Sequence, residues 1–173
     1  ARELFNNYGL GYMAYALINH HKQALQEVDE KKLNEFGRNL NSWGTVDTFA
    51  ALLAGPAWLH KQISDDSIVK WAHSEDRWWR RAALVCTIAL NKRSWGGTGD
   101  IPRTLKICRL LVKDKDDMVV KAMSWALREL IKHDAETVRN FLKEYDHVLA
   151  ARVKREVNNK LTTGLKNPKT KRI

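Results

Sequence analysis

The sequence predicts an all-α fold in which pairs of helices repeat along the chain. Apolar residues recur at helical spacing through most of the 173 residues, and no segment shows the strict alternation that is typical of a strand. Arg81, Lys121 and Arg155 occupy similar places in three successive apolar segments, and their spacings of 40 and 34 residues are near the period of helical-pair repeats. Stacked helix pairs form a curved solenoid with an extended concave surface, so we expect these basic residues to line one side of it.

The composition points to one globular domain with an excess of positive charge. Hydrophobic residues make up 44% of the chain and charged residues 29%, which is typical of a folded rather than a disordered protein. With 30 Lys and Arg against 20 Asp and Glu, the formal net charge is +10, and a field of that sign attracts polyanions. Nucleic acid is therefore the first partner to consider, and a solvated basic surface without a ligand is the alternative.

Several classes of protein are disfavoured by what the chain contains. Cys86 and Cys108 both lie in apolar runs, without the spacing of a disulfide framework or a zinc site, which fits a reducing compartment. The longest apolar run, residues 82–90, is far shorter than the ~20 residues of a membrane span. We therefore expect a cytoplasmic protein, nucleoid-associated if bacterial, with no cofactor and no metal. The chain starts at Ala1 without a signal peptide, which suggests that it begins inside a longer protein.

The first half of the chain is expected to form four helices. Asp29 is a typical acidic N-cap for the second of them, and the pair Gly55-Pro56 is a strong breaker that should end the third. The expected helices cover residues 4–18, 29–40, 43–54 and 57–63.

The second half begins with a helix capped by Ser64-Asp65-Asp66, and Ser74-Glu75-Asp76 starts the most apolar helix of the chain, which should lie in the core. Residues 94–100 are rich in glycine but follow no strand and lack the Lys-Ser/Thr of a phosphate loop, so we interpret them as a flexible connector. The remaining helices are expected over residues 77–91, 101–113, 118–133, 137–145 and 147–161, followed by a basic, disordered tail at 162–173.

One stretch, Asn41 to Phe49, carries the first candidate site residues. Trp43 and Asp47 stand four residues apart, so a helix starting here places indole and carboxylate one turn apart on the same face. A carboxylate among apolar neighbours is costly unless it is paired. The alternative is that Asp47 serves as a helix cap.

Two further features have purely structural alternatives. Arg80 and Arg81 lie on the most apolar helix, where an arginine commonly forms a salt bridge to a neighbouring helix, for example to Glu129. Trp125 lies on another apolar helix, where most tryptophans belong to the core.

Taken together, these stretches resemble the DNA alkylation repair family, the AlkD-like HEAT-repeat DNA glycosylases that excise N3- and N7-alkylated purines. The resemblance rests on Ser-Trp-Gly-Thr-Val-Asp-Thr-Phe at 42–49, Ser-Glu-Asp-Arg-Trp-Trp-Arg-Arg-Ala-Ala at 74–83, Lys-Ala-Met-Ser-Trp-Ala-Leu-Arg-Glu at 121–129 and, more weakly, Val-Lys-Arg-Glu-Val at 153–157. It implies a HEAT-like α-α superhelix with a basic concave face over residues 1–161. Family members carry further N-terminal helices that are absent from this sequence.

The resemblance also implies roles for individual residues. Asp47 matches the catalytic carboxylate, Trp43 and Trp125 match aromatics that face the lesion, and Arg81 matches an arginine that contacts the DNA backbone. Arg80, Lys121 and Arg155 are weaker candidates for phosphate contacts that set register without reading sequence. The implied partner is double-stranded DNA containing alkylated bases, bound by a monomer.

These roles are chemically consistent. Alkylation at N3 or N7 makes the purine a cationic leaving group, and a fixed carboxylate stabilises the oxocarbenium character that develops at C1′. We therefore expect a monofunctional base-excision glycosylase. The alternatives are a non-catalytic HEAT-repeat DNA-binding protein that recognises bent, branched or damaged DNA, and a protein-binding helical scaffold. Whether the base is flipped into a pocket or sensed through the backbone stays open.

Overall fold

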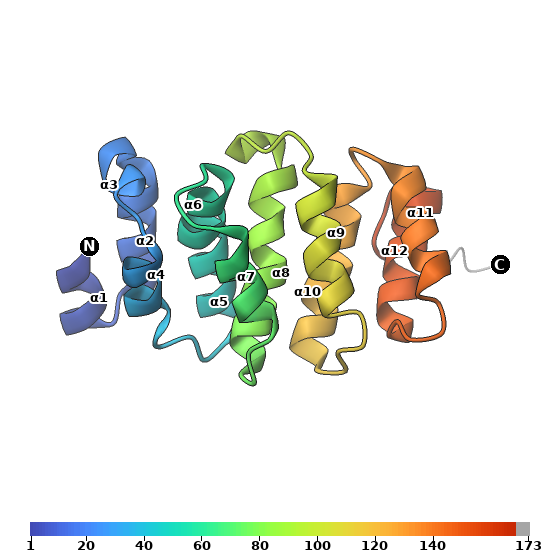
Figure 1. The fold of residues 1–173 in the computed structure, drawn as a ribbon, viewed down its shortest axis with the longest axis horizontal. Helices are drawn as coiled ribbons and strands as arrows, with labels where there is room; N and C mark the ends of the chain where they lie inside the picture. The colour runs from blue at the N-terminus through green and yellow to red at the C-terminus, as the bar shows by residue number, and fades with distance from the viewer. Residues whose placement is uncertain (169–173) are drawn as a thin grey trace.

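The computed structural model describes residues 1–168, and over this range the chain is helical throughout with no strand (Figure 1). The predicted all-α class is confirmed. The elements are α1 (Arg2–Tyr8), α2 (Gly11–His20), α3 (Lys22–Gln26), α4 (Glu30–Gly37), α5 (Trp43–Phe49), η1 (Ala50–Ala54), α6 (Gly55–Leu59), α7 (Asp65–Ala72), α8 (Arg77–Asn91), η2 (Arg93–Trp95), α9 (Ile101–Leu110), α10 (Asp117–Leu130), α11 (Ala135–Glu144) and α12 (Ala151–Thr163).

The helices form two rows along an elongated molecule (Figure 1). In the first row α2, α5, α8, α10 and α12 contact one another in succession, and in the second row α4, α7, α9 and α11 pack against them. Helix α8 lies at the centre of the molecule, and residues 82–90 of it are all buried. This arrangement agrees with the predicted stacking of helix pairs, and it brings residues far apart in sequence onto neighbouring helices of the first row.

Acidic N-caps define where the central helices begin. The side chains of Asp76, Asp116 and Asp134 accept hydrogen bonds from backbone N–H groups in the first turns of α8, α10 and α11. Each cap satisfies a donor that has no partner within the helix. The predicted starts of these helices therefore agree with the structure to within two residues.

The predicted helix end at Gly55-Pro56 is wrong. The chain continues from α5 into α6 through a π-helical turn, η1, in which the N–H of Gly55 donates to the carbonyl of Ala50. The wider turn accommodates Pro56, which has no N–H to donate. A Cβ on residue 55 would lie 2.6 Å from the Ala50 oxygen and 2.9 Å from the Cβ of Ala89, so glycine is needed for close packing against α8.

Other boundaries also differ from the prediction. The helices expected to end at residues 40, 63, 113 and 133 end three or four residues earlier, the helix expected from residue 147 starts at Ala151, and α3 was not expected. The first expected helix is two helices, because Gly9 adopts a left-handed conformation (φ 65°) between α1 and α2. The glycine-rich connector contains η2 and packs closely on the end of α8, where a Cβ on Gly97 would lie 2.4 Å from a backbone oxygen. Helix α12 continues to Thr163, past the expected boundary at 161. Of the expected tail, residues 169–173 lie outside the described residues.

Candidate functional site

Asp47 and Arg81 form a two-point ion pair between α5 and α8. The Nε of Arg81 donates to Oδ1 of Asp47 at 2.8 Å, and Nη2 donates to Oδ2 at 2.7 Å. Only 7% of the Arg81 side chain and 19% of the Asp47 side chain are exposed. Nη1 of Arg81 also donates to the backbone carbonyl of Met118 on α10. One arginine therefore connects three successive helices of the first row and provides the partner that a largely buried carboxylate requires.

The local sequence of α5 explains why Asp47 is available for this pair. The Oγ of Ser42 accepts the N–H of Thr45 at 3.3 Å, and the Thr45 hydroxyl accepts the N–H of Ser42 at 3.2 Å, which is a capping box. Ser42 is thus the cap, and the alternative that Asp47 caps the helix is wrong. Helix α5 starts at Trp43, so Trp43 and Asp47 project from the same face one turn apart.

Next to this pair, a hollow of about 280 Å³ opens on the first row of helices. It combines aromatic and cationic side chains from α5, α8, α10 and the segment after α12. The lining residues are Trp43, Arg81, Met118, Lys121, Trp125, Arg128 and Lys166. The structure therefore gathers Trp43, Arg81, Lys121 and Trp125 around one space, with Asp47 bonded to its Arg81 wall.

The two tryptophans of the hollow differ from the tryptophans of the core. Trp58 and Trp71 are 1% and 8% exposed, whereas Trp43 is 63% exposed. Trp125 is partly buried against the hydrophobic core and also lines the hollow. Placing a large indole in water gains nothing for folding, so the position of Trp43 is not explained by core packing.

The cations of the hollow have different partners. Lys121 pairs with Asp117 at 2.6 Å, and this hydrogen bond lowers the pKa of the Asp117 carboxyl. Arg128 donates from Nε to the Ser124 hydroxyl at 3.2 Å. Burial lowers the pKa of Arg128, while the carboxylates of Glu156 and Glu129 act in the opposite direction. Because an arginine stays protonated, the hollow carries positive charge beside two aromatic rings.

Two of the predicted cations do not line this hollow. Arg80 donates to Asp114 at 2.7 Å and to the carbonyls of Ser74 and Glu75, so its guanidinium is held at the start of α8. Arg155 is exposed on α12. The expected salt bridge from Arg81 to a neighbouring helix is confirmed, but its partner is Asp47 on α5, and Glu129 pairs with Lys132 instead.

Sequence reasoning missed Arg128 and Lys166. Arg128 could have been found, because it lies three residues after Trp125 and seven after Lys121, on the same face of one helix. Lys166 gave no such signal, because its position depends on a chain reversal after α12.

The described chain gives no indication of a metal centre or a membrane segment. Within residues 1–168, no group of three His, Cys, Asp or Glu side chains is arranged to hold a metal ion. Over the same residues, none of the helices combines the length and apolar character that crossing a bilayer requires.

Comparison with known proteins gave one match. The family model of DNA alkylation repair enzymes matches residues 6–161, which is most of the chain. No curated protein and no solved structure matched significantly.

Proposed function

Because the chain belongs to the family of DNA alkylation repair enzymes, we propose that it is a monofunctional DNA glycosylase acting on cationic N3- and N7-alkylated purines. Family membership supports a role in DNA repair, with DNA as the partner. The bond that is cleaved and the bases that are released are our proposal. The observation that carries it is the two-point pair between Asp47 and Arg81, beside a hollow lined by Trp43 and Trp125.

The aromatic rings suit a cationic base. Alkylation at N3 or N7 gives the purine a formal positive charge, and the face of an indole attracts cations by about 0.5–2 kcal/mol. Trp43 is exposed on α5, and Trp125 lines the same hollow from α10, so both rings are available to a nucleoside. An open hollow of about 280 Å³ suits recognition at the surface of the duplex rather than a deep pocket.

Asp47 provides the anion that the reaction needs. As the C1′–N bond breaks, its electrons neutralise the purine and positive charge develops at C1′ of the sugar. A carboxylate held in a fixed orientation stabilises that charge without reorganising, and it can orient the water whose oxygen then bonds to C1′. Both Asp47 oxygens are fixed by Arg81, which supplies this preorganisation.

Arg81 is suited to a second task. A guanidinium has five N–H donors, and three of those of Arg81 bond to Asp47 and Met118. In the described part of the chain, the remaining two on Nη1 and Nη2 have no partner, so they can donate to a backbone phosphate. We propose that Arg81 both orients Asp47 and fixes the DNA strand beside it.

A lyase step is not part of the proposal. Such a step requires a neutral amine that attacks C1′. The Nζ of Lys121 is engaged by the Asp117 carboxylate at 2.6 Å, so it is not free to attack the sugar. The product is therefore an abasic site in an intact strand.

The test is release of free 3-methyladenine and 7-methylguanine from methylated duplex DNA, separated by chromatography. Wild type should release both, and Asp47→Asn should be slower by about 100-fold or more, since it loses the charge that stabilises the transition state. Asp114→Asn is the matched control, because it removes the carboxylate paired with the neighbouring Arg80 and should keep activity. Wild type that binds the duplex and releases no base would leave the non-catalytic DNA-binding alternative.

A further inference from the structure

The chain reverses direction after α12 and brings a lysine to the hollow. Gly164 follows the last turn of α12 and adopts a left-handed conformation (φ 73°). The Nδ2 of Asn159 then donates to the carbonyl of Lys166 at 3.0 Å, so the returning segment lies along α12. Lys166 thereby lines the same hollow as Trp125 and Arg128 of α10.

Beneath this end of the hollow lies a buried carboxylate that the proposed chemistry does not use. Glu156 is 2% exposed and accepts the hydroxyl of Ser124 at 2.6 Å. Its Oε2 lies 3.5 Å from the Nζ of Lys166. The Ser124 oxygen in turn accepts the Nε–H of Arg128, and Oε1 of Glu156 lies 3.9 Å from Nη1 of Arg152, so one buried pair of polar side chains contacts three cations.

The cations here outnumber the carboxylates that neutralise them. Asp117 pairs with Lys121 and also with Arg152 at 3.4 Å. Within residues 1–168, Arg128 has no carboxylate within ion-pair distance, and the residue is partly buried. Positive charge that is oriented, partly desolvated and incompletely paired favours an anionic ligand.

We propose that Arg128 and Lys166 form a phosphate subsite, positioned by Ser124 and Glu156, for a backbone phosphodiester of the strand that carries the lesion. Arg81 lines the same hollow from α8, so a nucleotide between them is held through phosphates on its two sides. This subsite rests on the proposed function, because its ligand is DNA. It assigns strand positioning to Arg128 and Lys166 and leaves Asp47 as the residue that acts on C1′.

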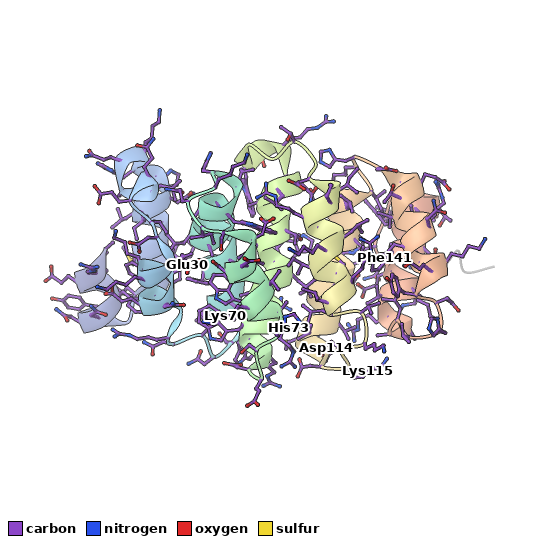
Figure 2. All side chains as sticks on the ribbon, in the orientation of Figure 1. Glu30, Lys70, His73, Asp114, Lys115 and Phe141 are labelled. Atoms are coloured by element: carbon purple, nitrogen blue, oxygen red, sulfur yellow. The ribbon has the colours of Figure 1, made fainter. Side chains whose placement is uncertain are left out.

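The experiment measures affinity for an unmodified duplex over a range of salt concentrations. Lys166→Ala and Arg128→Ala should each reduce the slope of log K against log[salt] by about 0.9, the value for one phosphate that the protein no longer neutralises. The control is Lys70→Ala on α7 of the second row, labelled in Figure 2, which removes the same charge as Lys166→Ala and should change the slope much less.

A neutral methylphosphonate at one position of the strand locates the contact. Moved along the strand of a duplex that holds one uncleavable abasic analogue to fix the register, it should weaken wild type at one phosphate beside the analogue and have no effect there on Lys166→Ala. Inorganic phosphate at constant ionic strength should leave this difference intact, since the ligand is part of the strand. If inorganic phosphate abolished the difference between wild type and Lys166→Ala, the site would bind free anions, and the proposal would be overturned.

A second variant tests the buried carboxylate. Glu156→Gln keeps an acceptor for Ser124 and removes the negative charge, so it should tighten DNA binding while Lys166→Ala weakens it. Two results together would overturn the subsite. The salt slopes of Lys166→Ala and Lys70→Ala would be equal, and the methylphosphonate would weaken DNA binding by wild type and by Lys166→Ala to the same extent. Because binding to unmodified DNA requires no excision, wild type that releases bases but fails this test rejects the subsite alone. If wild type releases no base but Lys166→Ala still shows the reduced salt slope, the glycosylase proposal alone is rejected.

Discussion

The Asp47–Arg81 pair can be measured as a free energy of unfolding. Arg81→Ala leaves a carboxylate that is only 19% exposed without its two donors, and it frees the Met118 carbonyl. Removing one partner of a buried pair costs about 3–5 kcal/mol, because the remaining charge stays unpaired. Partial exposure of Asp47 to water reduces this cost, so we expect a decrease of about 3 kcal/mol for Arg81→Ala.

A double-mutant cycle isolates the interaction. Urea unfolding of wild type, Arg81→Ala, Asp47→Ala and the double variant at neutral pH should give a coupling of about 2 kcal/mol, in the range for contacting residues. The same cycle on the exposed pair Glu136–Arg139 (71% and 52% exposed) should give less than about 0.5 kcal/mol. Additive effects of Arg81→Ala and Asp47→Ala would refute the reasoning that the two side chains hold each other.

Three further predictions concern stability and the aromatic face. Burial raises the pKa of Tyr15 to about 12. The free energy of unfolding should therefore keep its full value below pH 10 and decrease by about 2–3 kcal/mol as the pH rises to 12. In urea titrations, Tyr15→Phe should abolish this decrease. Gly55→Ala should lower the unfolding free energy by about 1–3 kcal/mol through overlap with α8, whereas Gly44→Ala, with open space around its Cβ, should not lower it. Trp43→Ala should leave stability within about 0.5 kcal/mol and slow the release of 7-methylguanine by roughly tenfold, as measured by single-turnover chromatography.

The parts of the fold that sequence reasoning predicted well are those decided locally. Asp76, Asp116 and Asp134 cap the helices they precede because a cap needs only a side chain and the next turn of backbone. The need for a partner for Asp47 also followed from its apolar neighbours. The identity of that partner, Arg81, is a tertiary fact that required α5 and α8 to be placed side by side.

The wrong predictions concern residues whose conformation or partner is decided by packing between helices rather than by local sequence. Gly55-Pro56 stops most helices, but here a π-helical turn and close contact with α8 carry the chain through. Arg80 and Arg81 are neighbours in sequence and point about 100° apart on a helix, so one pairs with Asp114 and the other with Asp47. Lys166 reaches the hollow because the chain reverses direction after α12, and no periodic pattern in the sequence predicts this reversal.

The central claim is that Asp47 supplies the negative charge for cleavage of the glycosidic bond. Single-turnover release of 7-methylguanine at saturating enzyme measures this step separately from binding. We predict that Asp47→Asn lowers this rate constant by about 100-fold or more while the dissociation constant for the duplex stays within a few-fold of wild type. An Asp47→Asn protein that releases the base at the wild-type rate would contradict the claim.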